Sequence, residues 1–232
     1  MADEFNGFPV ECFKFYRELE KNNSKQWFEQ HRADYEEHVL GPARRFVTAM
    51  GDKLARLCPG IHAEPMVDRS IFRIYRDVRF SSDKRPFKTN LALWFWEGSG
   101  KRMESSGFYL HLEPASIMLG VGMYIFPKEF LKEYRDSVVH PRYGQQLARA
   151  VQGALKKGDY ELWGEFYKKV PRGYPADHKN AELLLFNGLW AGVSSKVPKE
   201  AYSPAFVDYC YKSFADLHPV HRWLYEMTRR VG

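Results

Sequence analysis

Aromatic and aliphatic residues recur at helical spacing over the first sixty positions. The pattern predicts one helix over residues 8–21 and a second helix after Asn23, which is placed to cap it. His31 shares a face of the second helix with aromatic side chains, so we interpret it as a hydrogen-bonded core histidine. Gly41 and Pro42 are expected to interrupt this helix, and a second amphipathic stripe continues from Ala43 until Pro59 and Gly60 end it.

The spacing changes to that of strands in the middle of the chain. Apolar and polar residues alternate over residues 66–75, and residues 91–96 form a continuous apolar run, so both segments are predicted to be strands. Residues 107–113 and 116–124 are predicted to pair as antiparallel neighbours. In the second of these two strands, Gly120 and Gly122 leave room for another group to approach the backbone closely.

The last third of the chain returns to helical spacing. Predicted helices cover residues 127–139, 141–157, 179–187, 198–217 and 219–230. Helices that precede and follow a group of strands, without alternating with them, are typical of one fold class. We therefore predict an α+β fold, in which a central antiparallel sheet is flanked by N-terminal and C-terminal helices, as a single domain over residues 1–232.

Composition predicts a folded protein of the cytoplasm. Hydrophobic residues make up 44% of the 232 residues, enough for a substantial core without metals or disulfides. No run approaches the roughly 18 apolar residues of a membrane-spanning helix, so no membrane partner is expected. The first residues are acidic, which argues against a secretory signal. Cys12, Cys58 and Cys210 lack metal-binding spacing and are interpreted as reduced, buried thiols.

Positive charge is concentrated in one part of the chain. The formal net charge is +6, and residues 68–90 hold seven cations and three anions, which places +4 of this charge in that window. A local excess of this kind favours acidic partners or substrates. We call residues 69–90 the basic segment, and it is the strongest candidate for a functional surface.

The basic segment combines arginines, lysines, carboxylates and apolar residues. A guanidinium group offers five donors in a fixed fork that suits phosphate and carboxylate oxygens. The predicted ligand-binding residues are Arg73, Arg76, Arg79, Lys84 and Lys88. Asp77 and Asp83 would hold these cations in position, and both are candidate catalytic carboxylates. The interspersed apolar residues are expected to pin the segment to the core; they are Tyr75, Val78, Phe80 and Phe87.

Three functions are compatible with this segment. The first is binding, with or without turnover, of a small phosphorylated or carboxylated ligand. The second is nucleic-acid binding, which the positive charge favours but the interspersed acidic residues and the lack of a known nucleic-acid signature oppose. The third is a structural or partner-binding domain in which Arg–Asp pairs latch the segment. A small anionic ligand is favoured over nucleic acid. The sequence assigns no reaction, cofactor or oligomeric state.

A second candidate site lies on the predicted strand 107–113. His111 and Glu113 are two residues apart, so they share one strand face with Tyr109 and could act as acid and base or as metal ligands. A zinc deaminase also requires a P-C-x-x-C motif, which this chain lacks, and no third ligand is placed. No metal site is therefore predicted. Polar residues on a solvent-facing strand are the plainer interpretation.

Several motifs together resemble one protein family. In chain order they are Asn22-Asn23, Trp27-Phe28, Tyr35, Pro42, the run 73–89, Gly107-Phe108-Tyr109 and Pro171-Arg172-Gly173-Tyr174-Pro175 with His178. Over nearly its whole length the chain is similar to the domain of unknown function 2461 family, uncharacterised conserved proteins of bacteria and fungi. The pattern of that family often has tyrosine where this chain has Phe87. The resemblance implies membership of this family. It implies no reaction, cofactor or substrate.

Overall fold

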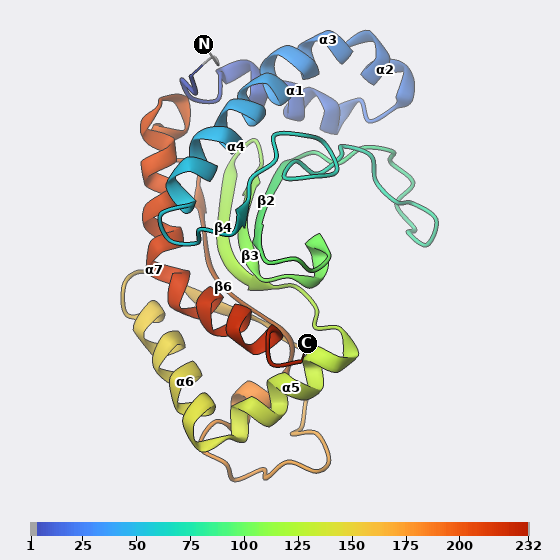
Figure 1. Cartoon of the computed structure of the whole chain (residues 1–232). Helices are drawn as coiled ribbons and strands as arrows, with labels where there is room; N and C mark the ends of the chain where they lie inside the picture. Colours follow the sequence, from blue (N-terminus) through green and yellow to red (C-terminus); the bar gives the residue numbers. More distant parts are fainter. Residues whose placement is uncertain (1–3, 232) are drawn as a thin grey trace. The chain divides into compact units, whose positions relative to one another are not determined.

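A computed structural model describes residues 4–231 (Figure 1). Two compact units can be distinguished. The first contains the residues up to Phe95 together with Tyr109–Leu119 and Ser194–Lys212. The second contains Trp96–Phe108, Gly120–Val193 and the residues from Ser213 onwards. Each unit is described separately below, and the predicted single domain stays a prediction.

The described residues form a six-stranded antiparallel sheet in the order β1-β2-β3-β4-β6-β5. Its strands are β1 Ile61–His62, β2 Leu91–Glu97, β3 Gly107–Leu112, β4 Ser116–Met123, β5 Glu161–Glu165 and β6 Phe186–Lys196. The predicted strands 91–96, 107–113 and 116–124 correspond to β2, β3 and β4. In the chain, helices precede and follow these strands, so the predicted α+β class is confirmed.

The N-terminal helices belong to the first unit. They are α1 Val10–Lys21, α2 Lys25–Gln30, α3 Arg32–Asp34, the π-helix η1 Tyr35–Leu40 and α4 Gly41–Leu54. Ser24, not the predicted Asn23, caps α2, because its hydroxyl accepts a hydrogen bond from the Trp27 amide at 3.3 Å. His31 donates from Nδ1 to the Trp27 carbonyl at 2.8 Å, as predicted, but its ring is only half-buried.

The predicted strand over residues 66–75 is wrong. This stretch is irregular and contains only isolated bridges, such as Ile71 with Leu93 and Tyr75 with Phe87. The Ser70 amide donates to the Glu64 carbonyl at 3.1 Å, and such local bonds interrupt the bonds to β2, for example that from the Phe72 amide to the Ala92 carbonyl at 3.0 Å, so no continuous ladder forms. Residues 66–69 are exposed, whereas Ser70, Ile71 and Ile74 are buried, so burial follows single anchoring residues and not the alternation of a regular strand.

The second unit contains α5 Lys128–Val139, α6 Pro141–Leu155, β5 and most of β6. The predicted helix 179–187 is wrong, because a 3-10 turn at Ala181–Leu185 leads directly into β6. The helices predicted at 198–217 and 219–230 are one helix, α7 Ala205–Thr228, with Pro219 inside it. Pro219 removes only one backbone donor, and the long apolar face continues across it.

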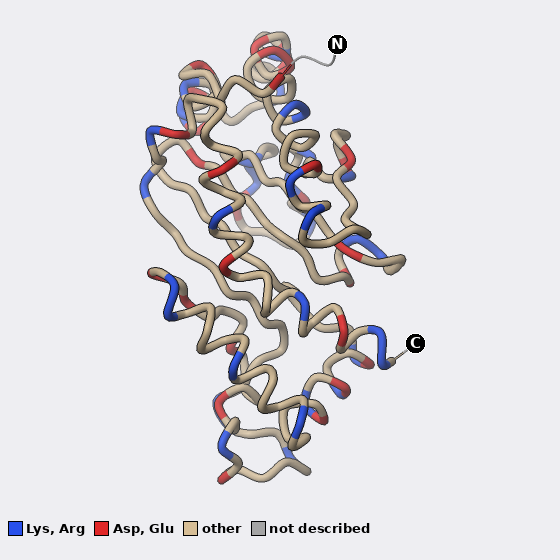
Figure 2. The backbone as a smooth tube through the Cα atoms, turned by 60° about the vertical axis from the view of Figure 1, so that its left-hand side comes forward, with Lys and Arg blue, Asp and Glu red and all other residues tan. Residues whose placement is uncertain are grey.

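Three further features bear on the expectations from composition. Cys12, Cys58 and Cys210 are buried, as predicted. None of the helices within residues 4–231 has both the length and the apolar character needed to cross a bilayer. Figure 2 shows that cations and carboxylates are interspersed along the backbone instead of forming long runs of one sign.

Candidate functional site

The basic segment forms an arm on the first unit, drawn as the teal loop in Figure 1. We use "the arm" for residues 75–87. The chain leaves the unit at Ile74 and returns at Lys88, whose amide donates to the Ile74 carbonyl at 2.8 Å. One step further out, the Arg76 amide donates to the Pro86 carbonyl at 2.9 Å. These two bonds close the base of the arm like a short hairpin.

Aromatic stacking and one asparagine hold the base of the arm. Phe87 is 1% exposed, and its ring stacks on Phe28 with centroids 4.4 Å apart. The Tyr75 ring lies 5.1 Å from that of Phe87. The amide group of Asn23 donates to the Phe87 carbonyl and accepts from the Phe87 amide, both at 3.0 Å. Asn23 therefore satisfies the backbone amide and carbonyl of Phe87, as a neighbouring strand would. The sequence did not predict this role.

Two carboxylates of the arm are committed to its own arginines. Asp83 pairs with Arg76 at 2.7 Å, and its Oδ2 accepts from Nε and NH2 of Arg85 at 3.0 and 2.8 Å. Asp77 accepts from Arg79 Nε at 3.0 Å and from its NH2 at 2.7 Å. Hydrogen bonds from Arg85 lower the pKa of Asp83, and those from Arg79 lower the pKa of Asp77 to about 2. Carboxylates this acidic accept protons poorly at neutral pH, which weighs against general-base catalysis by either.

The remaining predicted ligand cations differ in their partners. The Lys84 ammonium donates to the Val78 carbonyl at 2.9 Å, and that of Lys88 donates to the Arg73 carbonyl at 3.1 Å. Within residues 4–231, the Arg73 guanidinium donates no hydrogen bond, and its charge helps to lower the pKa of Asp77. Four of the five predicted ligand-binding cations thus already donate to the protein's own oxygens.

The tip of the arm carries the largest departure from the sequence-based expectation. Phe80 was expected to pin the segment to the core, but its side chain is 96% exposed. The Arg79 guanidinium lies 5.8 Å from the Phe80 ring and is itself largely exposed. Only Phe87 performs the predicted anchoring in full, because the two ion-paired turns direct the tip away from the core.

We expect the Asp77 carboxyl group to titrate at a pH of about 2, below its ordinary pKa of 3.8. Because the folded-state pKa is lowered, its pair with Arg79 is complete above a pH of about 4 and is lost as the pH falls through about 2. Carboxyl ¹³C NMR measures this titration directly. The Arg79→Gln variant should return the pKa of Asp77 towards 3.8, and a wild-type Asp77 that titrates there already would contradict the observed pairing.

The second predicted site is brought together on β3 and the turn after it. The Tyr109 hydroxyl lies 3.0 Å from His111 Nδ1, and His111 Nε2 lies 3.1 Å from Glu113. Ser116 donates to the other Glu113 oxygen at 2.7 Å, and this bond, with that from His111, lowers the pKa of Glu113. Burial raises the pKa of Tyr109 to about 12, so it remains a protonated donor. The group forms a continuous hydrogen-bonded series, and its catalytic use stays a prediction.

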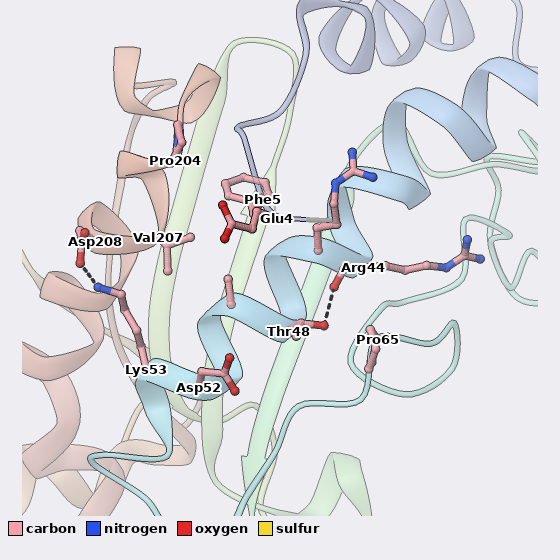
Figure 3. Close-up of a pocket in the computed structure, with 12 residues that line it drawn as sticks. Glu4, Phe5, Arg44, Thr48, Asp52, Lys53, Pro65, Pro204, Val207 and Asp208 are labelled. Carbon is pink, nitrogen blue, oxygen red and sulfur yellow. Dashed lines mark hydrogen bonds and ion pairs between the residues drawn. The ribbon is translucent and has the colours of Figure 1, made fainter. Parts of the chain in front are cut away.

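A hollow of about 530 Å³ lies elsewhere on the first unit (Figure 3). Phe5 and Val207 contribute apolar surface to it, while Lys53 of α4 forms an ion pair with Asp208 of α7 at its edge. Its lining includes equal numbers of acidic and basic residues, so it selects no sign of charge. None of the residues singled out from the sequence lines this hollow.

Comparison with protein families gives a match over most of the chain. The model of a family described as conserved hypothetical protein (DUF2461) matches residues 11–223. The matched span includes the whole basic segment, Asn23 and the His111–Glu113 pair. The search of curated proteins finds no match.

Proposed function

The chain belongs to this family, whose description assigns no activity, and we propose that it is a partner-binding domain whose arm docks on another protein. The observation that carries the proposal is the exposure of Phe80 at the tip of an arm that its own ion pairs already shape. The Arg–Asp pairs act as a latch, and Phe80 is the group that is presented.

The energetic argument concerns the Phe80 side chain. Full burial of a phenylalanine side chain contributes about 1.5–3 kcal/mol, a gain that Phe80 does not realise within this chain. An arm whose base is held by Asn23 and Phe87 loses less conformational entropy on binding than a flexible loop does. Aromatic side chains in such settings are frequent anchors of protein interfaces.

Charge indicates the chemistry of the partner surface. The exposed cations near the tip and base of the arm are Arg79, Lys84 and Arg73. The carboxylate partner of Arg79 and the carbonyl partner of Lys84 leave much of each side chain in solvent; Arg79, for example, keeps 75% of its side chain exposed. An apolar socket with an acidic rim is the complementary surface, because rim charges steer association and fix orientation.

The two other functions considered from the sequence remain predictions. A small anion at the basic segment must compete with Asp77, Asp83 and backbone carbonyls for the same donors. A nucleic acid would bring phosphates close to the same two carboxylates, which repel them. A small anion makes no use of the exposed Phe80, whereas a protein socket does.

Photo-crosslinking tests the proposal. Phe80 is replaced by p-benzoylphenylalanine, and the full chain is irradiated in an extract of the source cells. We expect discrete protein adducts, and we expect excess Phe80→Glu protein to be a poor competitor for them, whereas unlabelled wild-type chain competes fully. Phe166, an exposed phenylalanine of the second unit, provides the matched crosslinking position.

The outcomes separate the alternatives. Adducts that are the same from positions 80 and 166 would show that exposed aromatic residues react without specificity, and the proposal would fail. Adducts that disappear on nuclease treatment would instead support nucleic-acid binding. An adduct with a second copy of the chain would identify the partner as the protein itself. In each case the Phe80→Glu variant should keep the wild-type stability, because residue 80 makes no core contact.

A further inference from the structure

A groove with a volume of about 350 Å³ lies on the first unit, and this volume is in the range of small-ligand sites. One wall comes from α1, between residues 11 and 18, and the other from residues 27–38, which run from α2 into η1. Figure 1 draws these helices in blue. We call this feature the α1–α2 groove. None of its lining residues belongs to the arm.

The α1 wall carries a carboxylate on either side of an aromatic ring. Glu11, Phe15 and Glu18 recur at intervals of four and three residues, so they share one face of the helix. Glu11 and Glu18 are seven residues apart, which is about 10 Å along an α-helix. The groove therefore offers two separated negative groups along one wall, and Asp34 adds a third from the opposite wall.

Aromatic surface accompanies these carboxylates. The rings of Trp27 and His31 stack with centroids 4.0 Å apart and an interplanar angle of 13°, and the Phe15 ring lies 5.6 Å from that of Trp27. His31 Nδ1 donates to the Trp27 carbonyl, which holds the imidazole against the indole and leaves Nε2 as an acceptor in the neutral ring. Rings of this kind contact methylene groups, and tryptophan also attracts ammonium groups.

The charged residues of the groove carry an excess of negative charge. Three are acidic and one, Lys14, is basic. Within the part of the chain that the structure describes, the carboxylates of Glu11 and Asp34 form no ion pair and accept no hydrogen bond. Glu18 pairs with Lys21 at 3.1 Å, but both side chains are exposed. Because exposed pairs contribute little to stability, a ligand cation can replace Lys21 at Glu18.

The backbone of the second wall is unusual. Tyr35–Leu40 forms the π-helix η1, a rare conformation that occurs frequently at functional sites. Asp34 directly precedes this π-helix and His38 lies within it, and both line the groove. The conformation of the wall thus points to a functional site independently of the charges.

We propose that the α1–α2 groove binds a linear aliphatic diamine or polyamine. One ammonium group pairs with Glu18 and another with Glu11, while the methylene chain between them lies on Trp27 and Phe15. Aliphatic amines, like the lysine side chain, have a pKa of about 10, so both ends are charged at neutral pH. Two positive charges match the net charge of the groove, since three acids and one base leave an excess of two negative charges.

The geometry favours an organic cation over a metal ion. Among the described residues, the histidines and carboxylates of the groove do not bring three ligand atoms together, whereas a metal site needs convergent ligands. A diamine needs the opposite arrangement, with its acceptors separated along the groove. The inference goes beyond the proposed function of the arm and does not rest on it, because the two involve different residues.

Calorimetric titration of the full chain with a homologous series tests the inference. The probes are the unbranched diamines from 1,3-diaminopropane to 1,8-diaminooctane, in a buffer of about 50 mM salt so that screening is weak. Affinity should rise along the series by at least about tenfold, until the two ammonium groups reach both carboxylates. Hexylamine, which lacks one ammonium group, should bind at least about tenfold more weakly than 1,6-diaminohexane, and 1,6-hexanediol should not bind.

Charge variants locate the site. Glu11→Gln and Glu18→Gln should each weaken the binding of 1,6-diaminohexane at least about fivefold, because each removes one acceptor. Lys14→Gln should strengthen it, because a like charge is removed from the same groove. Glu37→Gln is the matched control, since Glu37 is an exposed carboxylate of η1 that does not line the groove, and it should leave the affinity unchanged.

The wild-type chain supplies a readout that depends on no variant. On addition of 1,6-diaminohexane, NMR shift changes should centre on residues 11–38 and include the indole N–H of Trp27. The inference is overturned if no diamine binds, if hexylamine binds as tightly as 1,6-diaminohexane, or if the shift changes map elsewhere. Equal losses from Glu37→Gln and Glu18→Gln would also overturn it, because they would show a general attraction to acidic surface.

Discussion

Replacement of Phe87 by alanine is expected to lower the free energy of unfolding by about 3–5 kcal/mol. Phe87 is fully buried and its ring stacks on Phe28, so truncation removes apolar contacts and leaves a cavity at the base of the arm. The Asn23 side-chain amide still bonds to the backbone of residue 87, but the aromatic ring that packs this segment onto the core is gone. Urea unfolding followed by circular dichroism measures the loss.

Phe80→Ala is the matched control for this prediction. It removes the same ring from the same arm, but residue 80 is almost fully exposed, so the free energy of unfolding should change by no more than about 0.5 kcal/mol. Equal effects at positions 80 and 87 would show that the arm does not adopt the described conformation. The contrast therefore tests the arm that carries the proposed function, independently of any partner.

Gly122→Ala is expected to cost about 3 kcal/mol or more, or to prevent folding of the second unit. Gly122 lies in β4 with φ of 145°, a conformation that residues with a side chain rarely adopt. A Cβ atom there would overlap the Leu189 carbonyl of β6. The sequence predicted that some group approaches Gly122 closely, and that group is β6. Solubility and urea unfolding of the variant provide the measurement.

Gly153→Ala serves as the control within the same unit. Gly153 lies in α6, and a Cβ atom there meets nothing within 4 Å. Alanine should therefore raise the free energy of unfolding by about 0.5–1 kcal/mol through its better helix propensity. A destabilised Gly153→Ala together with a tolerated Gly122→Ala would contradict the described packing of β4 on β6.

The fold was predictable where local pattern and final burial coincide. β2 is buried along its whole length, and its continuous apolar run is typical of such a strand. β6 was missed, because Gly188 and Gly192 interrupt its apolar pattern. Gly188 is needed at its position, since a Cβ atom there would overlap the Tyr124 carbonyl. This requirement arises between segments more than sixty residues apart, so it leaves no local periodicity.

Polar side-chain clusters divide in the same way. His111 and Glu113 were placed together correctly, because the two-residue repeat of a strand puts them on one face. The buried pair of Glu97 with His221 joins residues 124 positions apart, and no spacing rule brings them into contact. A buried pair of this kind is recognisable only once β2 and α7 have been placed.

Local chemistry encoded much of the arm. Asp77 and Arg79 are two residues apart, as are Asp83 and Arg85, so each pair needs only a turn of the backbone to form. Short-range preferences of this kind can be predicted from the sequence. The attachment of the base of the arm was decided elsewhere, because Asn23 binds Phe87, a residue 64 positions away. Contacts between distant residues depend on which apolar side chains of the whole chain are buried and which stay exposed. The sequence pattern of a single segment does not determine this.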